Sequence, residues 1–193
     1  VRGMFQSIYF LPYVTSLVAI GIVWSWLFNS EYGIINFILG KVGISPINWL
    51  NDPKYAMIAL IIFAVWKSLA FNTLILTTGI ASINPQYYQA AKIDQATSGT
   101  IFRKITVKLV SPMIAYTYVI SLIAAFKVYT EVYVLFGGRT LDGAVSTVVR
   151  YIIDRFYGDQ DFPLAFAASV VLLIIILTVT LVQKTVARNK IHY

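Results

Sequence analysis

The sequence contains no cysteine and a single histidine, His192. The missing cysteines exclude disulfides, thiolate catalysis and cysteine-ligated metals, and one histidine leaves little for a histidine-based metal centre. Charge is also scarce, since charged side chains make up only 12% of the 193 residues. We therefore predict neither a metal site nor a catalytic residue in this chain.

Apolar residues are abundant instead. They make up 59% of the chain, and the mean hydropathy is +0.76, which is more apolar surface than one water-soluble core buries. A helix needs about 20 apolar residues to span a bilayer, and four windows meet this requirement: 7–28, 55–80, 109–130 and 162–183. The sequence thus predicts an all-α polytopic membrane protein with four transmembrane helices.

The start of the chain points to a longer protein. It begins at Val1 instead of a methionine, and the first apolar run is too long for a cleaved signal peptide. We therefore expect further N-terminal helices that these residues do not include.

The distribution of charge predicts the orientation. Four spans place both termini and loop 81–108 on one side of the membrane, with eight basic residues and one acidic residue. Loops 29–54 and 131–161, on the other side, carry five basic and seven acidic residues. Basic residues accumulate on the cytoplasmic side, so we expect loop 81–108 and the C-terminus to be cytoplasmic. This topology explains the net charge of +7, and we expect membrane lipids, and no nucleic acid, as partners.

Two amphipathic helices are predicted in the outer loops. Apolar residues recur at helical spacing over 145–156, with Arg150 and Arg155 off the apolar stripe. A shorter helix over 31–41 is expected to stop at Gly40. Both helices are expected to lie at the outer interface or to cover the spans, and an interfacial helix without a specific partner is an open alternative.

The cytoplasmic stretch "YYQAAKIDQATSGTIFRKITVK", residues 87–108, separates two long apolar runs. Asn84 and Pro85 before it suit the start of a helix, which we expect to run to about Thr97. Gly99 is then expected to let the chain turn into a second helix. The sequence predicts a helix–turn–helix elbow, with an ordinary connecting loop as the alternative.

This stretch resembles the EAA loop of permease subunits of binding-protein-dependent ABC importers. The pattern of that loop is Glu-Ala-Ala, three residues, Gly, nine residues, then Ile-x-Leu-Pro. Ala90 and Ala91 match the two alanines, and Asp94 matches the aspartate that usually precedes the glycine. Gln89 replaces the glutamate, and Gln95 replaces the glycine.

The likeness extends along the chain. "FLPYVTSLVAIGIVWSWLFNSEYGIINFILG", "INWLNDPKYAMIALIIFAVWKSLAFN" and "FKVYTEVYVLFGG" are similar to the carbohydrate branch of these permeases, which transports maltose, multiple sugars and glycerophosphate. Such subunits have the MetI-like fold and usually six spans. The resemblance implies that residues 1–193 form one permease domain holding the last four spans, with a coupling loop at 84–108.

The resemblance implies a role for the elbow and a set of partners. In that family the EAA helix docks on a cytoplasmic ABC ATPase dimer, which binds ATP and Mg²⁺. The sequence has no G-x-x-x-x-G-K-[ST] loop of its own and is expected to hold no cofactor. The residues expected to couple to the ATPase are Gln89, Ala90, Ala91, Asp94, Gln95, Gly99 and Phe102. A second permease subunit, forming a heterodimer, and an external solute-binding protein complete the assembly in a bacterial or archaeal plasma membrane.

The substrate path is predicted from ionisable residues within the spans, which are costly there and are functional candidates. The candidate residues are Trp66, Lys67, Asn72, Lys127, Tyr129 and Glu131. Aromatic faces beside hydrogen-bond donors suit sugars. Equally, Lys67 could snorkel or pair with another subunit, and Lys127 could pair with Glu131 four residues further along one helix.

The expected function is that of a permease subunit that moves a sugar or related carbohydrate inward by alternating access. A channel or a membrane assembly scaffold without an ATPase partner is the alternative. An intramembrane hydrolase is disfavoured because the spans hold no Asp, Glu or His at depth.

Overall fold

The computed structural model describes residues 12–190, and within this range all regular structure is helical. The elements, in chain order, are α2 (Leu17–Leu27), α3 (Ile34–Lys41), α4 (Pro53–Ala81), α5 (Pro85–Ile93), α6 (Ser98–Ile101), the π-helix η1 (Phe102–Thr106), α7 (Val107–Phe126), α8 (Thr130–Phe136), α9 (Val148–Ile153), the π-helix η2 (Asp154–Gly158) and α10 (Phe162–Lys190). The predicted all-α class is confirmed.

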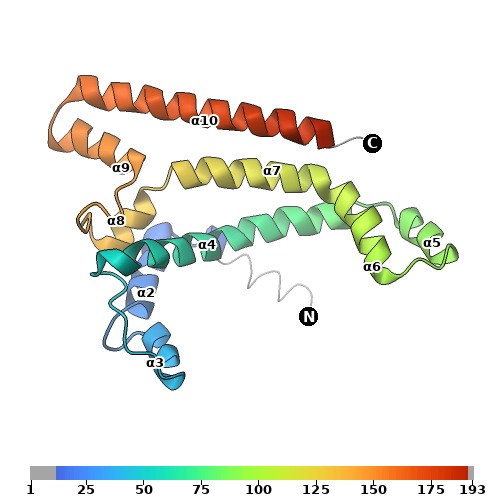
Figure 1. The fold of residues 1–193 in the computed structure, drawn as a ribbon, viewed down its shortest axis with the longest axis horizontal. Coiled ribbons are helices and arrows are strands. Elements are labelled where there is room, and N and C mark those ends of the chain that lie inside the picture. Colours follow the sequence, from blue (N-terminus) through green and yellow to red (C-terminus); the bar gives the residue numbers. More distant parts are fainter. Residues whose placement is uncertain (1–11, 191–193) are drawn as a thin grey trace.

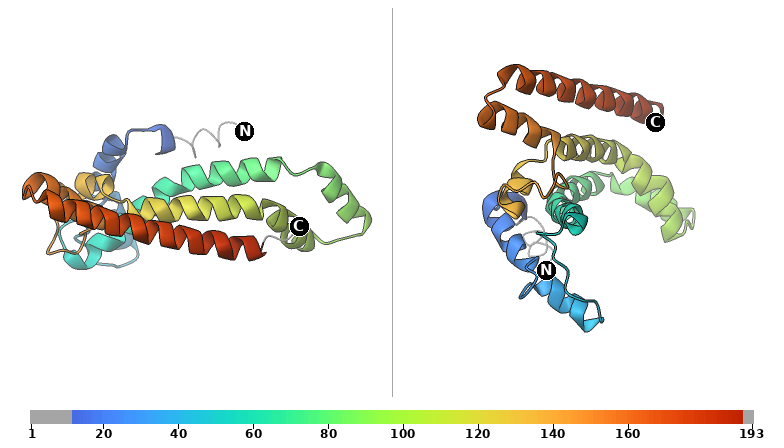
Figure 2. Two further views of the ribbon diagram at one scale, coloured as in Figure 1. Left: turned by 90° about the horizontal axis from the view of Figure 1, so that it is seen from above. Right: turned by 60° about the vertical axis from the view of Figure 1, so that its left-hand side comes forward.

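Three helical segments in the described range are long and apolar enough to cross a membrane: Pro53–Ala81, Ser98–Phe126 and Phe162–Thr185. In Figures 1 and 2 they lie side by side, with α7 between α4 and α10. The fourth predicted span differs. The helix α2 has 11 residues, about 16 Å in length, and a non-helical pair at 15–16 precedes it. Residues 7–11 of that prediction lie outside the described range.

The second long segment begins and ends earlier than the predicted window 109–130. It includes η1 and a proline, Pro112, which has no N–H to donate to the carbonyl of Lys108. The Ser111 hydroxyl donates to that carbonyl instead (2.8 Å), as hydroxyls do beside prolines in membrane helices. The helix ends at Phe126, and a non-helical link over 127–129 leads into α8.

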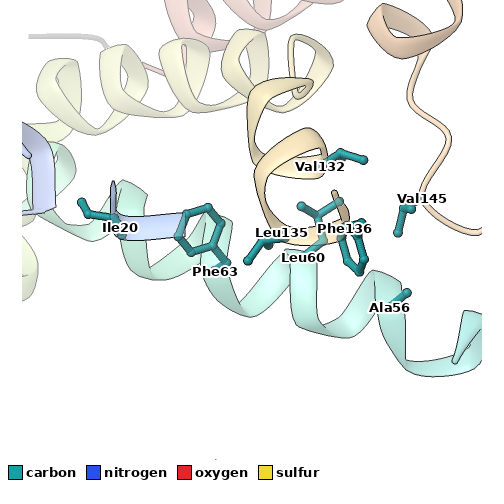
Figure 3. Packing of buried hydrophobic residues seen from close by; sticks show 8 residues of the cluster. All are labelled: Ile20, Ala56, Leu60, Phe63, Val132, Leu135, Phe136 and Val145. Carbon is teal, nitrogen blue, oxygen red and sulfur yellow. The ribbon is translucent and has the colours of Figure 1, made fainter. Parts of the chain in front are cut away.

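Most of the buried core lies at the end of the molecule that holds α2 and α8. Its main cluster comprises Ile20, Ala56, Leu60, Phe63, Val132, Leu135, Phe136 and Val145, drawn in Figure 3. These side chains join α2, α4, α8 and the segment before α9. Close approach is needed here, because a Cβ added to Gly21 of α2 would overlap the side chain of Val134 in α8.

The segment around α3 is organised by one buried amide, Asn36. Its Nδ2 donates to the carbonyl of Ile47 (2.8 Å), and its Oδ1 accepts from the ring N–H of Trp49 (2.9 Å). The predicted stop at Gly40 is wrong, because Gly40 lies within α3. The helix ends at Lys41, the last residue of the predicted range, and Gly43 two residues later has a φ of +82°, which favours glycine.

The second predicted amphipathic helix, 145–156, starts later than predicted and continues from α9 into η2 as far as Gly158. Val145 is buried but precedes α9, which starts at Val148. Arg150, predicted off the apolar stripe, is buried as well, because its guanidinium donates to Asp154 (3.0 Å) and to the carbonyl of Gly138. Periodicity alone could not predict these hydrogen bonds, which make the burial of this arginine possible.

Candidate functional site

Two features hold the residues singled out in the sequence. The first is an elbow, residues 82–106, which joins α4 to α7. Figure 1 and the left view of Figure 2 show it at the ends of α4 and α7 that lie far from α8 and α9. The second is a cavity of about 410 Å³ along α4 and α7.

The predicted start of the elbow's first helix, α5, is confirmed. Asn84 is its N-cap, with the side chain accepting a hydrogen bond from the backbone N–H of Gln86 (3.0 Å), and Pro85 is the first helical residue. The helix ends at Ile93, four residues before the predicted end at Thr97.

A left-handed residue, Gln95, terminates α5. Its φ is +53°, and its N–H donates to the carbonyl of Lys92 (3.0 Å) while the N–H of Ala96 donates to that of Ala91 (2.9 Å). This pair of bonds is the Schellman motif, in which glycine is the usual left-handed residue. The turn therefore lies at the position where the importer pattern has its glycine.

The prediction that Gly99 makes the turn is wrong. Gly99 lies inside α6, whose N-cap is Thr97, and its φ is not positive. The Thr97 hydroxyl accepts a hydrogen bond from the N–H of Thr100 (3.4 Å). Gly99 is thus an exposed helical residue, and no neighbour requires glycine there.

The two alanines of α5 point in different directions. Ala91 is buried (7% exposed) on the inner side of the elbow, where the Tyr88 hydroxyl also lies 3.1 Å from Oγ1 of Thr106. Ala90 is exposed. Tyr87, three residues before it, and Ile93, three residues after it, are exposed as well. We call the surface formed by Tyr87, Ala90 and Ile93 the outer face of α5. Ile93, on this face, is 82% exposed.

The other predicted coupling residues lie on the surface of the elbow. Gln89, Asp94, Gln95 and Phe102 are all exposed, and only Ala91 of the predicted set is buried. Geometry therefore leaves six of the seven residues accessible to a partner, and the role of all seven stays a prediction.

The cavity brings together three of the six residues predicted for a substrate path. Lys67, Asn72 and Glu131 line it. The other lining residues described are Tyr13, Ala64, Val65, Ser68, Phe71, Ile120, Ser121, Ala124, Ala125 and Val128. The polar groups are therefore few and set in a mostly apolar wall, which is typical of ligand pockets.

Lys67 and Glu131 form an ion pair across this wall. The Nζ of Lys67 lies 2.9 Å from Oε1 of Glu131, and the side chains are 34% and 16% exposed. The alternative pairing of Glu131 with Lys127 is not formed, because the link 127–129 interrupts the helix that would have aligned the two. The partner of Lys67 lies in its own chain.

Trp66, Lys127 and Tyr129 do not line the cavity. The indole of Trp66 packs in the aromatic cluster of the core, with its centroid 5.2 Å from that of Trp24. Tyr129 lies in the link before α8 and packs against Tyr133 at 6.1 Å between ring centroids. These positions place the three residues outside the cavity wall.

Sequence reasoning missed two neighbours of the predicted residues. Ser121 of α7 forms a hydrogen bond with the Asn72 amide (3.4 Å), and Phe71 stacks on Tyr13 with ring centroids 5.6 Å apart. The only sequence sign of Ser121 is a hydroxyl within an apolar run, and such hydroxyls also bond within their own helix.

Comparison with known proteins gives a consistent result. The family model described as "Binding-protein-dependent transport system inner membrane component" matches residues 1–191. The trehalose/maltose transport system permease protein MalF of Thermococcus litoralis is 32% identical over 187 residues, covering 97% of this chain and 63% of the relative. The arabinooligosaccharides transport system permease protein AraP of Bacillus subtilis is 32% identical, with 94% of this chain and 58% of the relative covered.

Solved structures agree with this result. A bacterial alginate ABC transporter in complex with an alginate pentasaccharide-bound periplasmic protein matches with a TM-score of 0.85 and 25% identity, covering 98% of this chain and 66% of that chain. A crystal structure of a bacterial ABC transporter involved in alginate import also has a TM-score of 0.85. The chain thus spans about three-fifths of the length of the curated relatives, 63% and 58% for the two above.

Proposed function

Because the chain belongs to the family of inner membrane components of binding-protein-dependent transport systems, we propose that it is part of the permease subunit of an ABC importer for a sugar or related carbohydrate. The observation that carries the proposal is the family match over residues 1–191, supported by relatives named for trehalose/maltose and arabinooligosaccharides. Substrate would cross by alternating access, driven by ATP hydrolysis in a separate subunit.

The elbow suits the coupling role. Its helix α5 is fixed at both ends, by the Asn84 cap and the Gln95 turn, and is held to η1 through Tyr88. A short helix fixed in this way moves as a rigid body with the long helices to which it is joined. The outer face of α5 presents apolar surface beyond the end of α4, and the exposed ring of Phe102 lies at the start of the second long segment; both suit burial against a protein partner.

The proposed partner of the elbow is a cytoplasmic ABC ATPase dimer, which would hold ATP and Mg²⁺. The excess of basic residues around the elbow and the C-terminus supports a cytoplasmic location for both. A second permease subunit and an external solute-binding protein complete the proposed complex in a bacterial or archaeal plasma membrane. The periplasmic protein bound to the similar alginate transporter supports the last of these.

The cavity suits a place on the substrate path. Lys67 lies at the middle of α4, and the break at 127–129 lies beside it. Transporters often bind substrate near the bilayer midplane at interrupted helices, since free backbone groups are tolerated where they line a cavity. Hydrogen-bonding groups from Asn72 and Ser121 and the Phe71 ring would contact a carbohydrate.

The experiment is uptake into proteoliposomes holding the full-length protein with its co-expressed partner subunits and binding protein. Radiolabelled maltose, trehalose and arabinotriose serve as probes. We expect ATP-dependent uptake of at least one carbohydrate, abolished when the phosphate-binding lysine of the ATPase is replaced by alanine. Uptake that is independent of ATP, and unaffected by that replacement, would contradict the proposal and support a channel.

A further inference from the structure

We propose that the Lys67–Glu131 ion pair sets the charge selectivity of the cavity, so that it accepts neutral polyhydroxy substrates and rejects anionic ones such as uronates. This inference rests on the proposed function, because it assigns the class of carbohydrate. The relatives leave that class open: trehalose and maltose are neutral, whereas alginate is named as an acidic polysaccharide.

The charges in the cavity are balanced. Among the described lining residues, Lys67 and Glu131 are the only charged ones, and they neutralise each other at 2.9 Å. Glu131 also lies in the first turn of α8, and the N-terminus of a helix favours a carboxylate. About one-third of the Lys67 side chain remains exposed while it is paired, and the residue lines the cavity.

The pair treats the two substrate classes differently. A hydroxyl group can accept a hydrogen bond from Lys67 and donate one to Glu131, so a neutral sugar binds without separating the charges. A carboxylate competes with Glu131 for the same ammonium group and is repelled by it. Displacing Glu131 would leave a carboxylate unpaired in a largely buried position (16% exposed), which is costly.

The other polar contacts of the cavity carry no charge to offset this cost. Asn72 and Ser121 bond to each other, and both can donate or accept with neutral hydroxyls. Most of the remaining wall is alanine and other apolar residues, with the Phe71 ring among them. The wall as a whole is thus suited to a neutral carbohydrate.

The test measures charge selectivity without knowledge of the substrate. A cysteine is placed at Ser68, which lines the cavity and whose hydroxyl donates to the Val65 carbonyl of its own helix (2.8 Å). The 193 residues contain no cysteine, and any elsewhere in the full-length protein is changed to serine. The assembled complex in lipid nanodiscs is reacted with anionic 2-sulfonatoethyl or cationic 2-trimethylammonioethyl methanethiosulfonate, and the peptide carrying residue 68 is quantified by mass spectrometry.

With the ion pair intact, the anionic-to-cationic rate ratio at residue 68 should be within about three-fold of the ratio at the exposed control S98C. The substitution E131Q should raise the ratio at residue 68 at least about ten-fold, and K67Q should lower it by a similar factor. The double variant should return it to the starting value. All ratios at S98C should stay unchanged, because the elbow lies at the far end of α4.

Unchanged ratios at residue 68 in both single variants would overturn the proposal, as would a strong preference for the anionic reagent with the pair intact. If E131Q does not fold, K67Q still gives a signed prediction. Labelling requires no ATP hydrolysis, so its failure leaves the importer assignment untouched. Conversely, ATP-independent uptake would refute the importer function whatever the labelling shows.

Discussion

The turn at Gln95 gives a prediction with a defined sign. A left-handed conformation costs a residue with a Cβ about 1–2 kcal/mol relative to glycine, and the φ of Gln95 is +53°. Glycine also loses more conformational freedom on folding, which offsets about 0.4–1 kcal/mol of the gain. The substitution Q95G should therefore stabilise the elbow by about 0.5–1 kcal/mol.

Hydrogen exchange of the elbow measures this stability directly. The amide of Ala96 donates to the carbonyl of Ala91 across the turn (2.9 Å), so it exchanges when the turn opens. A gain of about 0.5–1 kcal/mol slows its exchange about two- to five-fold. The assay is hydrogen–deuterium exchange with mass spectrometry on the purified complex, followed in a peptide that covers residues 90–97.

The matched control uses the same substitution inside α5. Gln89 is an exposed residue in the middle of the helix, so Q89G should destabilise the elbow by about 0.5 kcal/mol and speed exchange. Opposite effects of Q95G and Q89G are expected. Faster exchange in both variants would refute the left-handed turn at Gln95 and the reasoning based on it.

Two further predictions concern packing around α2 and α3, and both are measured by thermal unfolding of the purified protein. Asn36→Ala leaves the buried ring N–H of Trp49 and the backbone N–H of Ile47 without acceptors, so it should lower the free energy of unfolding by about 2–4 kcal/mol. The control Asn48→Ala, at an exposed position, should lower it by under about 0.5 kcal/mol. Gly21→Ala places a Cβ against the stiff side chain of Val134 and should cost about 1–3 kcal/mol. An Asn36→Ala protein as stable as Asn48→Ala would contradict the hydrogen bonds assigned to Asn36. A Gly21→Ala protein as stable as the unmodified chain would contradict the close approach of Gly21 to Val134.

Local patterns predicted the elements whose causes are local. The start of α5 at Asn84–Pro85 follows from capping chemistry, and the long apolar windows predicted α4, α7 and α10 to within a few residues at most ends. The larger miss is the start of the second long segment at Ser98. A second helix is expected there after the turn at Gly99, but the apolar window that defines the span begins only at 109, because Arg103, Lys104 and Lys108 precede it.

Features that depend on distant contacts were not predictable. The link at 127–129 occurs within a mixed apolar and aromatic run that fits a continuous helix, and α8 beyond it packs against α2 and α4. The ion pair of Lys67 and Glu131 joins residues 64 positions apart, so its formation depends on the fold. The sequence could predict that each is a candidate for the substrate path, but not that they meet.

The turn of the elbow was misplaced for another reason. Glycine is the usual left-handed residue, which favours Gly99, whereas the chain places Gln95 in that conformation. The hydrogen bonds that terminate α5 and the contact of Tyr88 with Thr106 fix the turn there. A contact between the two arms of the elbow thus outweighs the local preference for glycine.

The most direct test of the importer account asks whether an ATPase contacts the outer face of α5. Single cysteines at the exposed Ala90 and at the buried Ala91 are labelled with maleimide–benzophenone in the assembled complex and irradiated, and adducts are identified by mass spectrometry. The account predicts an adduct with a nucleotide-binding subunit from position 90 and much less from position 91. A fully labelled A90C protein that retains carbohydrate uptake yet yields no ATPase adduct would contradict the coupling role of the elbow.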